Sequence, residues 1–224
     1  MSFILHINTA FETASVILSH NEEIILELQS NSQKDHASFL EPAIKTTCTA
    51  AKISISSIDA ISVMNGPGSY TGLRVGLSSA KALCYALKKP LILLNTLDVM
   101  ALALKLQSPI VTDNILYCPL IDARRMEVFT ALYTFNLQLI RDYSAEILDE
   151  KFLQYEMQES LVVAGGNGSL KLEKILHNKK IIYVNPLILS QPSLILGNRS
   201  FLNTDFVNIV YSEPFYLKQV HFKK

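Results

Sequence analysis

The residues best suited to chemistry lie in one glycine-rich stretch, residues 65–74, which reads NGPGSYTGLR. Glycine tolerates positive φ and lets another backbone or a phosphate come close, and proline fixes φ between two such points. Residues 58–64 are predicted to form a short buried strand, and residues 73–87 a helix rich in small side chains. A strand, a glycine loop and a helix N-terminus together resemble an anion cradle. The candidate loop comprises Gly66, Pro67, Gly68, Ser69, Tyr70, Thr71 and Gly72.

The loop does not match the familiar phosphate or nucleophile motifs. A P-loop needs Lys followed by Ser or Thr after its glycines, and the dinucleotide fingerprint needs glycine where this chain has Thr71. A nucleophile elbow needs glycines two residues on either side of its serine, and Ser69 lacks them. A helix N-cap is therefore the favoured role for Ser69 or Thr71. A small-molecule kinase or acyl hydrolase that uses residues 66–72 stays open as the alternative.

A second polar concentration follows another predicted strand, at Asp122, Arg124, Arg125 and Glu127. Opposite charges at this point could clamp a ligand or form structural ion pairs, and ion pairing is the favoured interpretation. None of the five histidines is four residues from another, and the cysteines do not cluster. The sequence therefore predicts no metal site and no cofactor.

Composition indicates a folded cytoplasmic protein. The chain has 224 residues, of which 49% are hydrophobic and 18% charged, so disorder is not expected. A formal net charge of zero argues against a broad nucleic-acid surface, although a local patch can exist within a neutral total. Three separated cysteines are typical of reduced thiols. No apolar run reaches the length of a membrane span, so no membrane partner is expected.

The order of predicted elements indicates two lobes. Residues 1–107 read as three strands, a helix, a strand, the glycine-loop helix, a strand and a further helix. Residues 108–114 are polar and contain a proline, as at a lobe boundary. Residues 108–224 repeat parts of that order, with a hairpin and a second strand–glycine–helix junction at 165–168. The predicted domains are therefore 1–107, which carries the glycine loop, and 108–224.

The glycine stretch and the segments around it closely resemble the TsaB (YeaZ) family of bacterial tRNA threonylcarbamoyladenosine biosynthesis proteins. The resemblance rests on residues 64–76 (MNGPGSYTGLRVG), 80–83 (AKAL), 7–9 (INT), 36–42 (HASFLEP), 121–129 (IDARRMEVF) and 214–218 (PFYLK). It spans the chain, is strongest before residue 130 and is thin between about 140 and 210. The glycine signature is long enough to be specific.

The resemblance implies a two-lobed α/β fold of the actin/sugar-kinase/Hsp70 (ribonuclease H-like) type, with mixed sheets flanked by helices. It also implies a non-catalytic partner of TsaD, the subunit that modifies the adenosine beside the anticodon of tRNAs reading codons that begin with A. A TsaE-like ATPase and the tRNA would join through the complex, and a homodimer could form in the absence of TsaD. The helices of the first lobe would form the pairing surface. Its expected residues are Phe39, Ala43, Leu73, Leu77 and Ala80.

Three positions depart from the family pattern. Asn8 stands where an aspartate is usual, Asn167 lies within the second glycine turn, and Lys218 replaces a common arginine. An amide oxygen is a weaker magnesium ligand than a carboxylate, so Asn8 argues against nucleotide binding. Family membership does not depend on these three residues.

Overall fold

The chain forms two compact units that are not consecutive segments. The computed structural model describes residues 2–30 and 35–218. The first unit comprises Met1–Thr96 and Ser190–Phe215, and the second comprises Leu97–Leu189 and Tyr216–Lys224. The sequence predicted a single boundary between residues 107 and 108, and the structure divides the chain elsewhere. Residues 97–107 group with the second unit, and residues 190–215 return to the first.

The first unit contains a mixed five-stranded sheet in the order β3-β2-β1-β4-β5. The first three strands are β1 (Phe3–Asn8), β2 (Ser15–His20) and β3 (Glu23–Gln29), and they pair antiparallel in sequence order. On its other side β1 pairs in parallel with β4 (Ala60–Gly66), which pairs in parallel with β5 (Leu91–Asn95). The carboxyl ends of β1, β4 and β5 therefore meet at one edge of the sheet.

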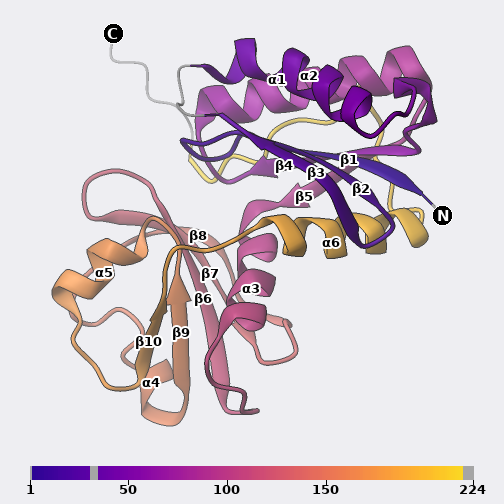
Figure 1. Ribbon diagram of the computed structural model, residues 1–224. Coiled ribbons are helices and arrows are strands. Elements are labelled where there is room, and N and C mark those ends of the chain that lie inside the picture. Colours follow the sequence, from indigo (N-terminus) through magenta and orange to yellow (C-terminus); the bar gives the residue numbers. More distant parts are fainter. Residues whose placement is uncertain (1, 31–34, 219–224) are drawn as a thin grey trace, which may run out of the picture. The chain divides into compact units, whose positions relative to one another are not determined.

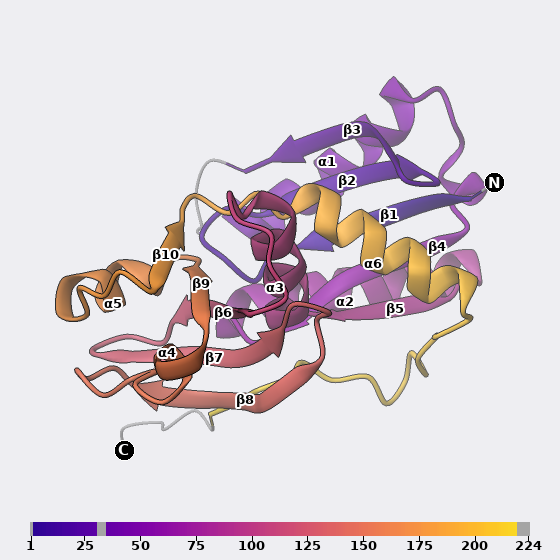
Figure 2. The same cartoon turned by 90° about the horizontal axis from the view of Figure 1, so that it is seen from below.

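Helices cover both faces of this sheet. Helices α1 (His36–Ala50) and α2 (Tyr70–Leu87) lie on one face, and α6 (Ser190–Leu202) crosses the other (Figures 1 and 2). A short 3-10 turn, η2 (Ile55–Ser57), precedes β4. Although a proline inside a helix removes one backbone donor, α1 continues through Pro42 as one helix.

The sequence does not predict α6, because Pro192 and Gly197 interrupt its helical pattern. In the structure Gly197 is needed where α6 meets the sheet, since an added Cβ would lie 2.7 Å from Cε1 of His6. Ser190 Oγ, at the start of the helix, donates to Glu27 of β3 at 2.8 Å. Tertiary contacts with the sheet therefore hold a helix whose own sequence pattern is weak.

A buried histidine lies between the sheet and α6. His6 is 3% exposed, with Nδ1 2.6 Å from Ser62 Oγ and Nε2 2.9 Å from Ser19 Oγ. The ring thus joins β1 to β2 and β4 beneath Gly197. Because burial disfavours the charged imidazolium, it lowers the pKa of His6 to about 3.

His6 should make stability depend on pH in a defined window. The folded pKa of about 3 lies below the ordinary value of 6.5, so the unfolded chain takes up the proton first as pH falls. The stability from neutral His6 is therefore complete above about pH 6.5 and is lost as pH falls toward 3. Between those values His6 changes the free energy of unfolding by up to about 1.4 kcal/mol per pH unit. Urea denaturation at several pH values between about 4 and 6.5 gives the free energy of unfolding. This free energy should change less steeply with pH for His6→Gln than for the unmodified chain.

The control for this measurement is His20→Gln, which removes an imidazole from a half-buried position at the end of β2. Both variants are compared with the unmodified chain in the same buffers. Equal slopes for His6→Gln and the unmodified chain would contradict the role assigned to His6.

The second unit repeats the sheet topology of the first. Its mixed sheet has the order β10-β9-β6-β7-β8. Strands β6 (Ile115–Asp122), β7 (Glu127–Thr134) and β8 (Leu139–Ile147) are antiparallel, whereas β9 (Leu161–Gly165) and β10 (Ile181–Val184) extend the sheet in parallel from β6. Each unit therefore has three antiparallel strands followed by two parallel ones, which confirms the predicted architectural repeat.

Helix α3 (Thr96–Gln107) is anchored in the second unit by a carboxylate. Asp98 Oδ1 accepts hydrogen bonds from the hydroxyls of Tyr133 at 2.6 Å and Tyr143 at 2.8 Å. Burial and the Asp98 charge both raise the pKa of these phenols, so they remain protonated donors. The two shorter helices of this unit are α4 (Glu156–Glu159) and α5 (Ser169–Ile175).

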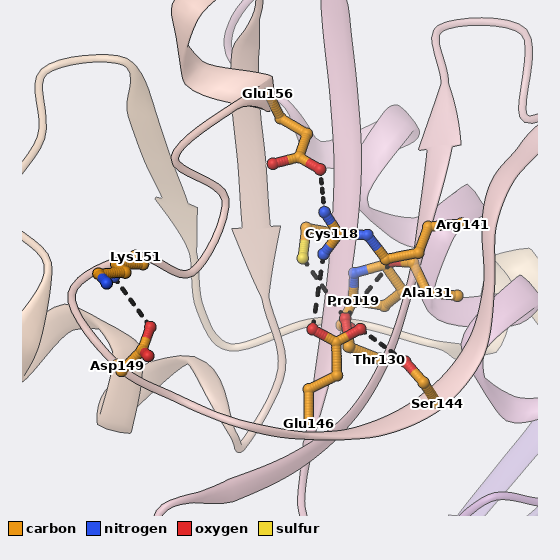
Figure 3. A network of polar contacts seen from close by, with 10 residues as sticks. All are labelled: Cys118, Pro119, Thr130, Ala131, Arg141, Ser144, Glu146, Asp149, Lys151 and Glu156. Atoms are coloured by element: carbon orange, nitrogen blue, oxygen red, sulfur yellow. Dashed lines mark hydrogen bonds and ion pairs between the residues drawn. The ribbon is translucent and has the colours of Figure 1, made fainter.

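A charged network connects β8 to α4 (Figure 3). Arg141 lies between Glu146, at 3.6 Å, and Glu156, with which it forms a close ion pair. Ser144 Oγ donates to Glu146 at 2.7 Å. These side chains are partly exposed, and ion pairs of this kind contribute on the order of 0.2–1 kcal/mol. The network therefore orients α4 more than it stabilises the unit.

The predicted free thiols are confirmed. Cys48, Cys84 and Cys118 are unpaired and buried. Burial raises the pKa of Cys84 and Cys118 to about 12, so their reactive thiolate forms are scarce at neutral pH. Within the described parts of the chain, no helix has both the length and the apolar character needed to cross a bilayer.

Candidate functional site

The glycine loop joins the end of β4 to the start of α2 and contacts the turn that follows β1. The Ser69 N–H donates to the carbonyl of Ala10 at 2.8 Å. Ser69 Oγ accepts the Gly72 N–H at 3.3 Å, which makes Ser69 the N-cap of α2. The predicted capping role of Ser69 is thus confirmed, and the helix begins at Tyr70. Two N–H groups that a bound phosphate would need already donate within the chain.

The glycines of the signature are required by close packing of this turn. A Cβ atom at Gly68 would lie 2.5 Å from the carbonyl oxygen of Ala10. At Gly72 it would collide with the carbonyl oxygen of Thr9, and at Gly76 with Thr9 Oγ1. We refer to residues 9–10 as the elbow. The elbow occupies the space that side chains would fill, which explains three glycines without an anion.

A segment from the end of the chain closes the other side of the loop. Gly66 has φ +122°, and an added Cβ would collide with the carbonyl oxygen of Phe215. The Phe215 N–H donates to the carbonyl of Asn65 at 2.7 Å. Lys81 Nζ, on α2, donates to the carbonyls of Val210 at 3.2 Å and Ser212 at 3.0 Å. The loop is therefore held between the elbow and residues 210–215.

Asn8 shapes the elbow through its side chain. Asn8 Oδ1 accepts the Ala10 N–H at 3.0 Å, an Asx turn that an aspartate could also make. Nearby, Thr9 Oγ1, Asn65 Oδ1 and Thr96 Oγ1 are buried without a hydrogen-bond partner among the described residues. These atoms lie at the carboxyl ends of β1, β4 and β5, the edge at which open α/β sheets bind ligands. No group of three His, Cys, Asp or Glu side chains in the described ranges is placed to hold a metal.

The residues expected to face a partner lie mostly in the core of the first unit. Ala43, Leu73, Leu77 and Ala80 are 0–4% exposed, and only Phe39 is half-buried. The physical reason is that each helix has one apolar face, and this face packs against the sheet. This corrects the sequence-based expectation of direct contact for these four residues. A partner must instead meet other positions on α1 and α2.

The outward side of α2 carries one exposed charged residue, Arg74, near the start of the helix. From Ser78 onward the exposed residues of the helix are uncharged, namely Ser78, Ala82, Tyr85 and Ala86, and Tyr85 is 83% exposed. Exposed residues on α1 include Pro42, Thr46, Thr49 and Ala50, together with the charged Glu41 and Lys45. An exposed aromatic beside small, uncharged residues is typical of protein interfaces.

The second polar cluster forms ion pairs, but not with its own arginines. Asp122 pairs with Lys171 of α5 at 2.7 Å, and Glu127 pairs with Lys218. The predicted structural ion pairing is therefore confirmed for the two acids. Lys218, which departs from the family pattern, takes the position of a pairing cation, and Asn167 Oδ1 accepts the Asp122 N–H at 2.9 Å.

Sequence reasoning missed which residues contact the loop. Thr9, Ala10 and Phe215 are distant from it in sequence and have no unusual side chains. The only signal was that residues 7–9 and 214–218 belong to the same family pattern as the glycine stretch. Sharing a family pattern does not show that these residues contact the loop.

The family model described as "TsaD: tRNA N6-adenosine threonylcarbamoyltransferase" matches residues 24–214. The chain belongs to the TsaD family. Its curated relatives place it with the TsaB (YeaZ) type within that family. A TsaB protein of Bacillus subtilis is 27% identical over 176 residues, which cover 77% of this chain and 74% of that protein. One from Buchnera aphidicola of Acyrthosiphon pisum is 26% identical and covers 95% and 99%.

Solved structures confirm the predicted fold class. YeaZ from Pseudomonas aeruginosa superposes with a TM-score of 0.76 at 22% identity and covers 97% of this chain and 100% of that one. A putative N-acetylmannosamine kinase from Listeria monocytogenes gives a TM-score of 0.50 at 12% identity and covers 91% and 99%. The two mixed sheets flanked by helices are thus of the actin/sugar-kinase type.

The packing role of the glycines can be tested by comparing two alanine substitutions in α2. In an exposed helix, Gly→Ala stabilises by about 1 kcal/mol. Here Gly76→Ala should instead destabilise by about 1–3 kcal/mol, because the new methyl group meets Thr9 Oγ1. Thr9→Ala in the same chain should recover most of that loss, since it removes the colliding oxygen. Urea denaturation of the single and double variants measures the coupling.

Gly72→Ala is the matched control, because its collision is with the Thr9 carbonyl, which no substitution removes. Thr9→Ala should therefore fail to rescue it. A stabilising effect of Gly76→Ala would show that the elbow does not constrain this helix.

Proposed function

We propose that the chain is a non-catalytic, activating subunit of the complex that installs threonylcarbamoyl on tRNA. The modified base is the adenosine beside the anticodon of tRNAs that read codons beginning with A. The chain acts by binding a TsaD-like catalytic subunit. The proposal rests on family membership together with the packing of the signature loop. In that loop the chain's own elbow occupies the space beside the glycines.

The chemistry of the loop favours a supporting role over a catalytic one. The Ser69 hydroxyl accepts a hydrogen bond from the Gly72 N–H, as a cap does, and the Ser69 N–H is committed to Ala10. The loop fixes the direction in which α2 leaves the sheet. Its rigidity is useful to a binding surface carried by that helix.

The outward side of α1 and α2 is the proposed binding surface. The match to the TsaD model and the 36% identity of part of the chain to a tRNA N6-adenosine threonylcarbamoyltransferase of Bartonella bacilliformis relate this chain to catalytic proteins. Related folds can pair through equivalent faces in a pseudo-symmetric way. The uncharged positions Ser78, Ala82 and Tyr85 then meet their counterparts on the catalytic subunit. In the absence of that subunit, the same face supports a homodimer.

A charge placed on this surface should block the pairing. Ala82→Glu and Ser78→Glu each put a carboxylate on an exposed helix position, so folding is preserved while an interface would have to bury it. We expect the affinity for a purified TsaD-like subunit to fall at least about tenfold. Calorimetric titration measures this, and thermal melting checks the fold. A charge at Leu77 would not test the interface, because it would unfold the unit at a core position that is 3% exposed.

The control is Leu170→Glu on α5, where the side chain is 57% exposed in the other unit. It should leave the affinity unchanged. If both α2 variants bind the TsaD-like subunit as tightly as the unmodified chain, α2 is not part of the interface.

The TsaE-like ATPase and the tRNA are proposed to join through the TsaD-containing complex. The rival enzyme function, a small-molecule kinase or acyl hydrolase, makes a different prediction. Tight ATP–magnesium binding with turnover by the isolated chain would favour it. Co-purification with tRNA-modification proteins would favour the subunit role.

A further inference from the structure

We propose that Arg124 and Arg125, at the tip of the β6–β7 hairpin, bind the phosphate backbone of the tRNA substrate. We call this pair the arginine tip. The inference rests on the proposed function and adds to it a direct contact between this chain and the tRNA.

The backbone of the arginine tip adopts a conformation that residues with side chains take at a cost. Arg124 has φ 70° and Arg125 has φ 47°, so two consecutive residues with side chains adopt the left-handed region. Asn and Gly adopt the left-handed region at lower cost than arginine. Strain of this kind concentrates at functional sites. Two arginines here point to a use for their side chains.

Neighbouring groups hold the strained turn in place. Asp122 Oδ1 accepts the Arg124 N–H at 2.6 Å, and the carbonyl of Arg124 accepts the Glu127 N–H at 3.1 Å. The Ala123 N–H donates to the carbonyl of Glu127 at 3.1 Å. Lys171 Nζ donates to Asp122 at 2.7 Å and to the Glu127 carbonyl at 3.1 Å. The tip is therefore a preorganised platform, which reduces the entropy lost on binding.

The acids beside the tip do not neutralise its arginines. Lys171 pairs with Asp122, and Lys218 pairs with Glu127. Arg124 and Arg125 are exposed, and neither side chain has an ion-pair partner within the described ranges. Each of these two ion pairs has no net charge, so the net positive charge at the tip is that of the two arginine guanidinium groups. In a chain of zero net charge, this is a local cationic site.

The chemistry of the site fits phosphodiester groups. A guanidinium presents a planar fork of donors that matches a phosphate, and adjacent arginines can engage neighbouring phosphates of one strand. Relatives of the chain are named for tRNA threonylcarbamoyladenosine biosynthesis, so an RNA backbone is the polyanion that a complex of this type encounters. Two arginines supply only a few contacts, which agrees with a chain that has no broad basic surface.

The test combines Arg124→Asn with Arg125→Gly, because Asn and Gly adopt the left-handed region at lower cost. Relief of strain should raise the melting temperature by roughly 2–4 °C or leave it unchanged. Binding of the assembled complex to an unmodified tRNA transcript should weaken on the order of tenfold at about 0.1 M salt. The slope of log affinity against log salt should fall by about 1.5, as expected for two lost phosphate contacts. Arg124→Lys with Arg125→Lys keeps the charges and should retain most of that slope.

The outcomes separate this inference from the proposed function. If the unmodified chain fails to bind the TsaD-like subunit, the proposed function falls and this inference falls with it. If the variant complex forms and binds tRNA with equal affinity and salt slope, only this inference is overturned. If the variant instead loses its TsaD-like partner while the unmodified chain keeps it, the arginine tip is a protein contact and the tRNA contact is wrong.

Discussion

The first unit depends on the close approach of the elbow to the glycine loop. The carbonyls of Thr9 and Ala10 lie where side chains of Gly72 and Gly68 would otherwise be. This contact brings the carboxyl end of β1 against the first turn of α2, and it can form only if those positions lack a Cβ atom. The direction of α2 and the burial of its apolar face follow from it. The same contact leaves little room at the loop for a phosphate.

Burial of the helices' apolar faces determines what remains for a partner. Leu73, Leu77 and Ala80 of α2 pack against the sheet, so from Ser78 onward the exposed residues of the helix are small ones and one tyrosine. Arg74, one turn before Ser78, is the exposed charged residue of the described helix. The stability of the unit and the character of its outer surface are therefore two consequences of one helical pattern.

The two units use one topology for different purposes. Each has three antiparallel strands followed by two parallel ones, and each has a glycine turn after a parallel strand. In the first unit the glycine turn meets the elbow. In the second, Asn167 of the glycine turn and Lys171 of α5 support Asp122 and the hairpin that carries Arg124 and Arg125. The repeat thus pairs a helical surface with a rigid cationic hairpin tip, each carried by its own unit.

The sequence by itself determined the strands, the main helices, the N-cap at Ser69, the free thiols and the family, because these depend on local pattern and on a long specific signature. The sheet order within each unit, the return of α6 to the first unit and the contacts at Gly66 and Gly72 were decided only by the tertiary structure. Those features join residues such as Thr9, Gly197 and Phe215 that are distant in the chain and ordinary in type. The same holds for the interface: periodicity identifies an apolar face, but only packing shows that the sheet buries Leu77 while Ala82 stays exposed.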